Sequence, residues 1–353
     1  MIKKIKNKIF KIKSPKNHFN EFLNKCVKVS KQYEYVAICP QTTGYNYMGV
    51  NRATHSIFEN QTCVIPQNYS NQVISDSEIK ELINSLVQHK VKVIVLSGFP
   101  EYFKKIVIEA NKKNILVNVI YHGWLGELSA KKNELNTIIS LCNQDKINKL
   151  GFVKKGLEEC ISRFYDINCL TIPIGINKIK FDIKKFASFD NKIHIGILGN
   201  SDFRKNLQNQ IMGALMVENS IIHINDPSLI YLNRIDNRFV IEEKNLSHKE
   251  YLELLAKMDV NLYASYSESW GLVVSESISV GVPCMASNNS GVLDFSEKLK
   301  SFLILNENDN PFEVFKKINY IIENKENITN LFEEYLFNLN SSCNNKKAEF
   351  IYD

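Results

Sequence analysis

The chain has 353 residues, of which 44% are hydrophobic and 23% are charged. This is ordinary globular usage, which excludes a chain that is disordered over most of its length, and the length predicts about two domains. No apolar run approaches the ~18 residues that a membrane-spanning helix needs. The formal net charge is +6, and its uneven distribution along the chain is more informative than its size.

The eight cysteines are not spaced as a disulfide framework, since no C-x-x-C pair occurs. Cys39, Cys63 and Cys169 lie in apolar, strand-like runs, where cysteine acts as a small hydrophobic residue. Cysteines and histidines do not cluster with the spacing of zinc ligands. No uninterrupted apolar segment follows the basic N-terminus, so we expect no secretory signal and a reducing, cytosolic compartment.

The first sixteen residues contain seven lysines and no acidic residue. Within them Ile2, Ile5, Ile9 and Ile12 recur at helical spacing, and lysines occupy most other positions. A helix with this pattern can bury its apolar stripe in a lipid surface and place its lysines among anionic headgroups. The alternatives are a solvated basic tail and a first helix that packs on the body. We expect residues 1–16 to bind an anionic membrane surface.

After this segment, a helix over 19–31 begins an alternation of apolar runs of strand length with helical patterns. In the first half we predict strands at 35–39, 62–65, 91–96, 115–121, 149–153 and 169–172. We predict helices between them at 76–90, 101–113, 129–143 and 154–164, with Asp76 as the N-cap of the first. Buried strands separated by helices predict a parallel sheet with crossover helices.

A polar, lysine-rich stretch over 175–191 interrupts this pattern, and the alternation then restarts. We predict strands at 193–198, 220–224, 238–242, 260–263, 283–287 and 302–305. The predicted helices are 204–217, 248–258, 271–280, 311–324 and 328–339. Two successive α/β units of similar size predict a cleft that the carboxyl ends of both sheets face. We expect a basic segment 1–16, domains at 17–175 and 176–330, and a final helix or tail at 331–353, which is a candidate to return to the N-terminal domain.

Residues 265–294 are the most informative stretch. A predicted strand ends near Tyr263, Glu268 lies in the following loop, and Gly271 opens a helix that carries Glu276 in its second turn. Amides in the first turn of a helix are unpaired and, together with the helix dipole, form an anion site. Here those amides belong to Gly271, Leu272 and Val273. The two carboxylates could accept hydrogen bonds from vicinal hydroxyls on either side of a bound phosphate, which is the layout of a nucleotide sugar.

The seven-residue gap between Glu268 and Glu276, with Gly271 inside it and Gly281-Val282-Pro283 after it, resembles the donor-site motif of glycosyltransferase family 4. The resemblance covers about residues 193–322 well and is weaker in the first half. It implies an α/β GT-B architecture of two Rossmann-like domains whose parallel sheets face a central cleft. It also implies that Glu268 faces the donor sugar and that Glu276 holds the ribose.

A second part of the resemblance lies after the predicted strand at 193–198. Gly199 and Asn200 form a turn there, and Arg204 and Lys205 start the next predicted helix. In the resembled family this turn supplies an arginine and a lysine that neutralise the departing diphosphate. Lys205 matches the family lysine, whereas the family arginine often sits where this chain has Asn200, so Arg204 is the substitute. Cations at a helix N-terminus oppose its dipole, which an anionic ligand would rationalise.

Two segments of the first half complete the predicted site. His122 follows the predicted strand at 115–121, where members of the resembled family often present a histidine to the donor sugar. Gly44, Gly49 and Arg52 follow the first strand and resemble a glycine-bearing loop that approaches the phosphates or the acceptor. This loop is neither a Walker motif nor G-x-G-x-x-G.

The sequence therefore predicts a glycosyltransferase that moves a sugar from a nucleotide-sugar donor to a glycan or lipid-linked glycan, in the synthesis of a bacterial-type surface polysaccharide or lipopolysaccharide. The resemblance implies retention of configuration, although an inverting variant with His122 as the base stays open. The sequence contains no D-x-D motif, so we expect neither a metal nor another cofactor. We expect a cytoplasmic enzyme held peripherally at the inner face of the cell membrane, without a nucleic-acid partner. The alternatives are a non-catalytic nucleotide-sugar-binding or membrane scaffold protein of the same fold, and a GT-B sugar-nucleotide epimerase or phosphorylase.

Overall fold

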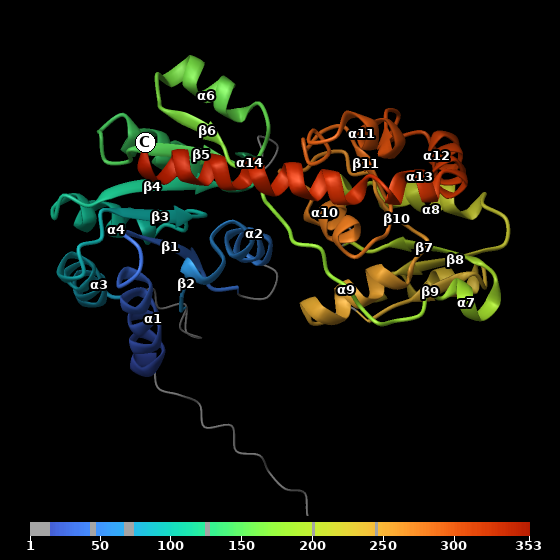
Figure 1. Ribbon diagram of the computed structural model, residues 1–353, viewed down its shortest axis with the longest axis horizontal. Helices are drawn as coiled ribbons and strands as arrows, with labels where there is room; N and C mark the ends of the chain where they lie inside the picture. Colours follow the sequence, from blue (N-terminus) through green and yellow to red (C-terminus); the bar gives the residue numbers. More distant parts are fainter. Residues whose placement is uncertain (1–14, 43–46, 67–73, 124–127, 200–201, 244–245) are drawn as a thin grey trace, which may run out of the picture. The chain divides into compact units, whose positions relative to one another are not determined.

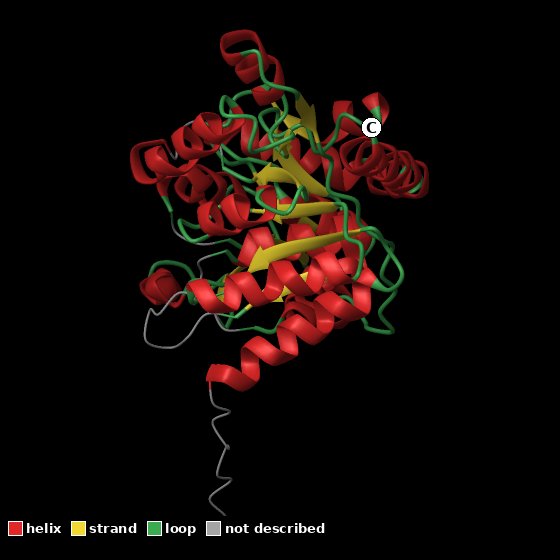
Figure 2. Cartoon of the chain, turned by 90° about the vertical axis from the view of Figure 1, so that its left-hand side faces the viewer, coloured by secondary structure: helices red, strands yellow, loops and turns green. Residues whose placement is uncertain are grey.

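The computed structural model describes residues 15–42, 47–66, 74–123, 128–199, 202–243 and 246–353. The chain divides into two compact units, Met1–Ile120 with Asn136–Lys149 and Tyr121–Leu135 with Leu150–Asp353. Two six-stranded sheets, each flanked by helices, form the framework (Figures 1 and 2). The predicted α/β class with two parallel sheets is confirmed.

The first sheet has the strand order β2-β1-β3-β4-β5-β6. Its strands are β1 (Tyr35–Pro40), β2 (Thr62–Ile65), β3 (Val93–Ser97), β4 (Leu116–Tyr121), β5 (Lys149–Phe152) and β6 (Cys169–Thr171). Its helices are α1 (Pro15–Ser30), α2 (Met48–Phe58), α3 (Asp76–Gln88), α4 (Phe103–Asn111), α5 (Leu128–Cys142) and α6 (Leu157–Tyr165). Every residue of β1 and β3 is buried, because helices cover both faces of the sheet, as Figure 2 shows.

The second sheet has the strand order β12-β11-β10-β7-β8-β9. Its strands are β7 (Ile193–Ile197), β8 (Ser220–Ile224), β9 (Phe239–Ile241), β10 (Val260–Tyr263), β11 (Cys284–Ser287) and β12 (Ile304–Leu305). Its α-helices are α7 (Ala187–Asp190), α8 (Leu207–Leu215), α9 (His248–Lys257), α10 (Leu272–Ser279), α11 (Glu297–Leu303), α12 (Pro311–Glu323), α13 (Lys325–Thr329) and α14 (Phe332–Tyr352). Two 3-10 helices, Phe203–Lys205 and Pro227–Arg234, lie between strands.

Two expectations about local structure are wrong. The segment after β1 contains helix α2, which includes Gly49 and Arg52, where we expected only a loop. Arg204 and Lys205 do not open an α-helix but lie in a separate 3-10 helix. Asn206 follows in the left-handed conformation, with φ 55°, and divides that turn from α8. Asparagine tolerates this conformation better than most residues, because its short side chain can bond nearby backbone groups.

The N-terminus of α3 shows how a local signal can be misassigned by one residue. Its N-cap is Ser75 and not the predicted Asp76, and Ser75 forms a capping box with Glu78. The side chain of Ser75 accepts from the Glu78 amide at 3.3 Å, and the Ser75 amide donates to the Glu78 carboxylate at 2.8 Å. This reciprocal pair satisfies two amides that the helix leaves unpaired.

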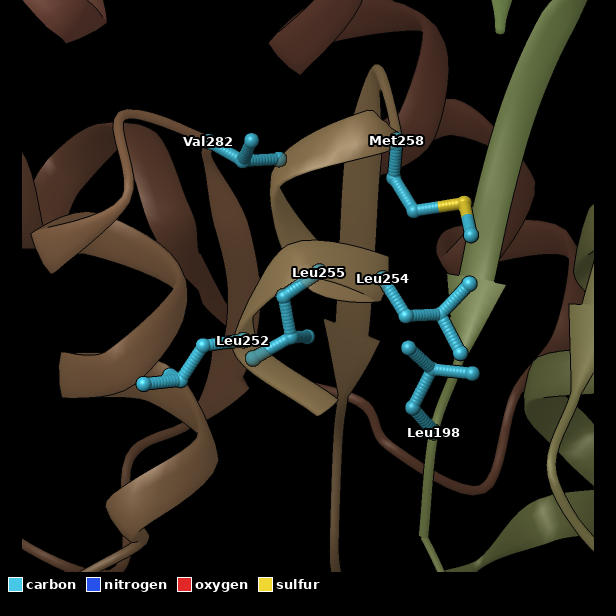
Figure 3. Close-up of a cluster of buried hydrophobic side chains, with 6 residues drawn as sticks. All are labelled: Leu198, Leu252, Leu254, Leu255, Met258 and Val282. Atoms are coloured by element: carbon cyan, nitrogen blue, oxygen red, sulfur yellow. The ribbon is translucent and has the colours of Figure 1, made fainter. Parts of the chain in front are cut away.

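A buried hydrophobic cluster holds α9 against the second sheet and α10 (Figure 3). It comprises Leu198, Leu252, Leu254, Leu255, Met258 and Val282. Val273 and Val280, which lie at the two ends of α10, pack against it. In Figure 3 the side chains of Leu198, Leu254 and Met258 gather beside the helix, with Leu254 between the other two. The positions of α9 and α10 are thereby linked by apolar packing.

The final helix, α14, runs along the second unit and contacts segments far apart in the sequence. The side chain of Asn340 donates to the Ile176 carbonyl at 3.0 Å and accepts from the Ile176 amide at 2.9 Å. The Tyr335 hydroxyl donates to the Val292 carbonyl at 2.7 Å. Near the end of the helix, Phe350 lies so close to Gly151 of β5 that a Cβ there would be 3.2 Å from its ring. We predicted a shorter helix at 328–339, and the structure instead has α13 and this longer α14.

The basic segment lies almost wholly outside the described residues, since α1 begins at Pro15. The predicted helix at 19–31 is confirmed, with a start four residues earlier. Among the described residues, we find no helix with both the length and the apolar character needed to cross a membrane.

Two glycines in helices offer a matched test of the packing of α8 on α12. A Cβ on Gly213 would lie 2.3 Å from the Val314 side chain and 2.8 Å from the Pro311 carbonyl oxygen, whereas a Cβ on Gly49 meets nothing within 4 Å. We expect Gly213→Ala to lower the free energy of unfolding by about 1–3 kcal/mol, because a tightly packed contact must open. Gly49→Ala should be neutral or stabilising by up to ~1 kcal/mol, because alanine has the higher helix propensity. Urea unfolding measures both, and equal effects would contradict the close packing.

Candidate functional site

The candidate site lies where the strand order of the second sheet reverses. β7 and β10 pair in parallel, with Val260 opposite Ile195 and Asn261 opposite Gly196. From this pair the chain order continues through β8 and β9 on one side and through β11 and β12 on the other. Open α/β sheets bind ligands at such a switch point, beyond the carboxyl ends of the strands. The segments that follow β7 and β10 carry most of the predicted donor-site residues.

Three charged side chains form a partly buried cluster there, which we call the charge cluster: Arg204, Lys205 and Glu268. The Glu268 carboxylate oxygen Oε1 accepts from Arg204 Nη1 at 2.9 Å and from Lys205 Nζ at 2.5 Å. The side chains of Arg204, Lys205 and Glu268 are 25%, 11% and 10% exposed. Sequence analysis assigned Glu268 and the two cations to different parts of the donor, and the structure brings all three into direct contact.

Tyr263, the last residue of β10, joins the charge cluster and was missed by the sequence analysis. Lys205 Nζ donates to the Tyr263 hydroxyl and lies 4.6 Å from the centre of its ring. Burial raises the pKa of Tyr263 well above its ordinary value, and the nearby charge of Glu268 raises it further, so the hydroxyl stays protonated. The position of Tyr263 at the carboxyl end of a strand, just before the motif, is the sequence feature from which its role could have been predicted.

Buried amides fasten the 3-10 helix to the segment that follows β10. The Asn206 side chain donates to the Ala264 carbonyl at 2.9 Å. The Gln210 side chain accepts from the Ala264 amide at 3.0 Å and donates to the Lys205 carbonyl at 2.7 Å. Both amide side chains are buried, where such hydrogen bonds are costly to break. They fix the backbone that carries the two cations against the backbone that carries Glu268.

Electrostatics set the protonation of the two cations in different ways. Burial lowers the pKa of Lys205, and the negative charge of Glu268 partly opposes that effect. For Arg204 burial also acts to lower the pKa, but the charge of Glu268 and of its other neighbours outweighs it, and the pKa is raised. Burial and the charge of Glu268 therefore act in opposite directions on both groups, and the pKa of Arg204 is raised whereas that of Lys205 is lowered. Lys154, after β5, has a pKa lowered by burial and partly restored by Glu268 as well.

Helix α10 begins directly after Gly271, where the sequence predicts an anion site. Gly271 is the N-cap in the left-handed conformation, with φ 86°, and no side chain among the described residues caps the helix. A residue with a Cβ rarely adopts this backbone conformation. The amides of Leu272 and Val273 follow in the first turn, where intrahelical acceptors are lacking and the helix dipole is positive.

Glu276 lies in the second turn of α10 and is only 2% exposed. Its Oε1 lies 3.1 Å from Nε2 of His248, the first residue of α9. Sequence analysis missed His248, and no short-range signal links it to Glu276, because the two residues meet only through the packing of α9 on α10.

The other predicted residues are placed less directly. Gly199 is half-buried after β7, and a Cβ there would lie 3.9 Å from the Tyr263 ring. His122 directly follows β4 and is half-buried. Asn200 and Gly44 lie outside the described residues. In the described part of the chain, no group of three or more His, Cys, Asp or Glu side chains is arranged to hold a metal ion.

Comparison with known proteins gives one match in sequence and many in structure. Residues 232–335 match the family model "Glycosyl transferases group 1". No curated protein matches the chain in sequence. The matched segment includes β10, Glu268, α10 and Glu276, which are the elements that carry the motif.

Among solved structures, Anabaena HepE in complex with UDP and glucose has a TM-score of 0.66 at 14% identity, covering 89% of this chain and 98% of that one. Sucrose-phosphate synthase from Thermosynechococcus elongatus has a TM-score of 0.60 at 14% identity, covering 90% and 96%. WaaG, a glycosyltransferase involved in lipopolysaccharide biosynthesis, has a TM-score of 0.57 at 15% identity, covering 90% and 99%. At these identities the likeness shows a shared fold. Together with the matched segment, it supports one class of enzyme, a glycosyltransferase of the GT-B type.

The charge cluster predicts how the pKa of Lys205 responds to a mutation. Because the carboxylate of Glu268 opposes the effect of burial, Glu268→Gln should lower the pKa of Lys205 further below its ordinary value. We expect the midpoint of pH-dependent acylation of Lys205, followed by mass spectrometry, to move to lower pH. The exposed Lys316 in the same spectra is the internal control, and an unchanged midpoint for Lys205 would contradict the coupling.

Proposed function

We propose that the chain transfers a sugar, with retention of configuration, from a nucleoside diphosphate sugar to a glycan or lipid-linked glycan. The observation that carries this proposal is the charge cluster at the switch point of the second sheet, close in sequence to the start of α10. Two cations and a helix N-terminus suit a diphosphate. In a nucleoside diphosphate sugar, the diphosphate joins the donor sugar to the ribose, and both carry hydroxyl groups. The carboxylates of Glu268 and Glu276 can accept hydrogen bonds from those hydroxyl groups.

In this mechanism Arg204, Lys205 and the first amides of α10 bind the diphosphate and neutralise the charge that develops as it departs. Groups held in place before the reaction stabilise that charge without reorganising. Since these groups belong to the chain, we propose transfer that needs no metal, and activity that persists in excess chelator is the expected result.

The reacting centre is the anomeric carbon of the donor sugar. Its bond to the phosphate oxygen breaks while its bond to the acceptor oxygen forms on the same face. The acceptor proton passes to the departing phosphate, so that no dedicated base is required. Glu268 faces the donor sugar and orients it, and His122 is a further contact to the sugar from the first sheet.

The comparisons support the donor class and suggest the setting. HepE is known in complex with UDP and glucose, and WaaG is involved in lipopolysaccharide biosynthesis. We propose a role in bacterial-type surface polysaccharide or lipopolysaccharide synthesis at the cytoplasmic face of the membrane, with residues 1–16 as the contact to anionic lipid. A thermal-shift panel of nucleoside diphosphates, with UDP as the first probe, tests the donor class, because a ligand that binds only the native state raises its stability. No shift with any member would contradict the proposal.

Replacement of Glu268 separates transfer from binding. If Glu268 orients the sugar, Glu268→Gln should lower kcat on the order of 10²-fold, the scale for losing one polar group at a reacting centre. Binding of the bare nucleoside diphosphate, measured by calorimetry, should change much less. Glu297→Gln, at a side chain 84% exposed, is the matched control and should leave both unchanged. Equal losses of transfer and of nucleotide binding in Glu268→Gln would reject the assigned role.

The basic segment can be tested by deleting residues 1–16. Each lysine near an anionic surface contributes about 1 kcal/mol, screened over a Debye length of ~8 Å at physiological salt. The deletion should therefore lower binding to anionic vesicles, and added salt should release the full-length chain. Transfer to a soluble acceptor should survive, because every proposed donor residue lies beyond residue 16. The proposed membrane contact would be refuted if the full-length protein did not bind anionic vesicles at low salt.

A further inference from the structure

We infer that His248 is a positioning residue that holds the carboxylate of Glu276 for the ribose diol of a nucleoside diphosphate. The inference rests on the proposed function, since it assigns a supporting residue to the same donor site. His248 is the first residue of α9, seven residues after the end of β9. His248 lies outside the sequence motif that contains Glu268 and Glu276.

The hydrogen bond has only one possible direction. An ionised carboxylate accepts and cannot donate, so Nε2 of His248 carries the hydrogen that Glu276 Oε1 accepts across 3.1 Å. Both the imidazolium and the neutral tautomer with hydrogen on Nε2 supply it. A carboxylate has about four lone-pair positions, so this bond orients its plane and still leaves acceptor capacity for ribose hydroxyls.

The hydrogen bond to His248 matters because the carboxylate of Glu276 is buried. The side chain of Glu276 is 3% exposed, whereas that of His248 is 52% exposed. Burying a carboxylate without hydrogen-bond donors raises the free energy of the folded state. The side chain of Glu276 therefore needs donors to stay ionised and to keep one orientation. His248 reaches it from the solvent side, which places the imidazole at the border of the site.

The first turn of α9 is built to hold His248 in place. Ser247 caps the helix, with a capping box to Glu250. Residues three and four positions apart share a face of a helix, so Tyr251 and Leu252 lie on the same face as His248. The Tyr251 hydroxyl donates to the Leu198 carbonyl at 3.1 Å, and Leu252 belongs to the hydrophobic cluster of Figure 3. The helix is thereby fixed both to the exit of β7 and to α10.

The test measures the affinity of the full-length chain for three probes. They are the nucleoside diphosphate that binds best in the panel, its 2′,3′-dideoxy analogue, and inorganic diphosphate. We expect His248→Ala to weaken binding of the nucleoside diphosphate about three- to tenfold, the scale of one hydrogen bond. Binding of the dideoxy analogue and of inorganic diphosphate should stay within error of wild type. His248→Gln, whose amide can still donate, should recover most of the loss, which a merely structural defect would not allow.

A double-mutant cycle shows whether His248 acts through Glu276. In a Glu276→Ala background, His248→Ala should cause no further loss of affinity. His89→Ala, at the C-cap of α3, is the matched histidine control and should leave all three probes unchanged. Additive losses, or an equal loss for the dideoxy analogue, would overturn the inference while leaving the proposed function intact. A wild-type chain that binds no nucleoside diphosphate would refute the proposed function itself.

Discussion

The candidate site depends on the ion pairs that Glu268 makes with Arg204 and Lys205. Two cations close together in a partly buried place repel one another and lose hydration, and both effects disfavour their charged forms. A single carboxylate oxygen within 2.9 Å of both cationic groups offsets these costs. The pKa of Lys205 nevertheless remains below its ordinary value. An anionic ligand close to these cations would add negative charge and favour their charged forms.

Strand pairing and buried hydrogen bonds in the second sheet bring the segments that carry these three side chains next to each other. Parallel pairing of β7 with β10 brings two distant segments side by side, and Asn206 and Gln210 then fasten the turn after β7 to the backbone after β10. Gly196 is required at the pairing itself, because a Cβ there would lie 2.2 Å from the Asn261 side chain. Buried amide hydrogen bonds are directional, so they define this turn more sharply than apolar contacts alone would.

A second carboxylate, Glu276, is held in a different way. One of its partners is a half-exposed histidine on a neighbouring helix, and the hydrophobic cluster packs that helix against α10. The two glutamates of one motif thus have distinct surroundings. Glu268 is paired with Arg204 and Lys205, whereas Glu276 is buried beside an imidazole. This difference accords with the separate tasks proposed for them, one at the reacting sugar and one at the ribose.

The sequence by itself determined the α/β class, most strands and the residues of the motif, because buried strands, helix periodicity and a glycine at a helix start are local signals. It did not reveal α2, and it placed Arg204 and Lys205 in an α-helix, because the short 3-10 turn depends on the buried contacts of Asn206 and Gln210. Only the tertiary structure joined Glu268 to both cations and to Tyr263, and Glu276 to His248. Those contacts link residues up to 64 positions apart, and the order of strands in a sheet, which local patterns do not encode, decides which of them meet.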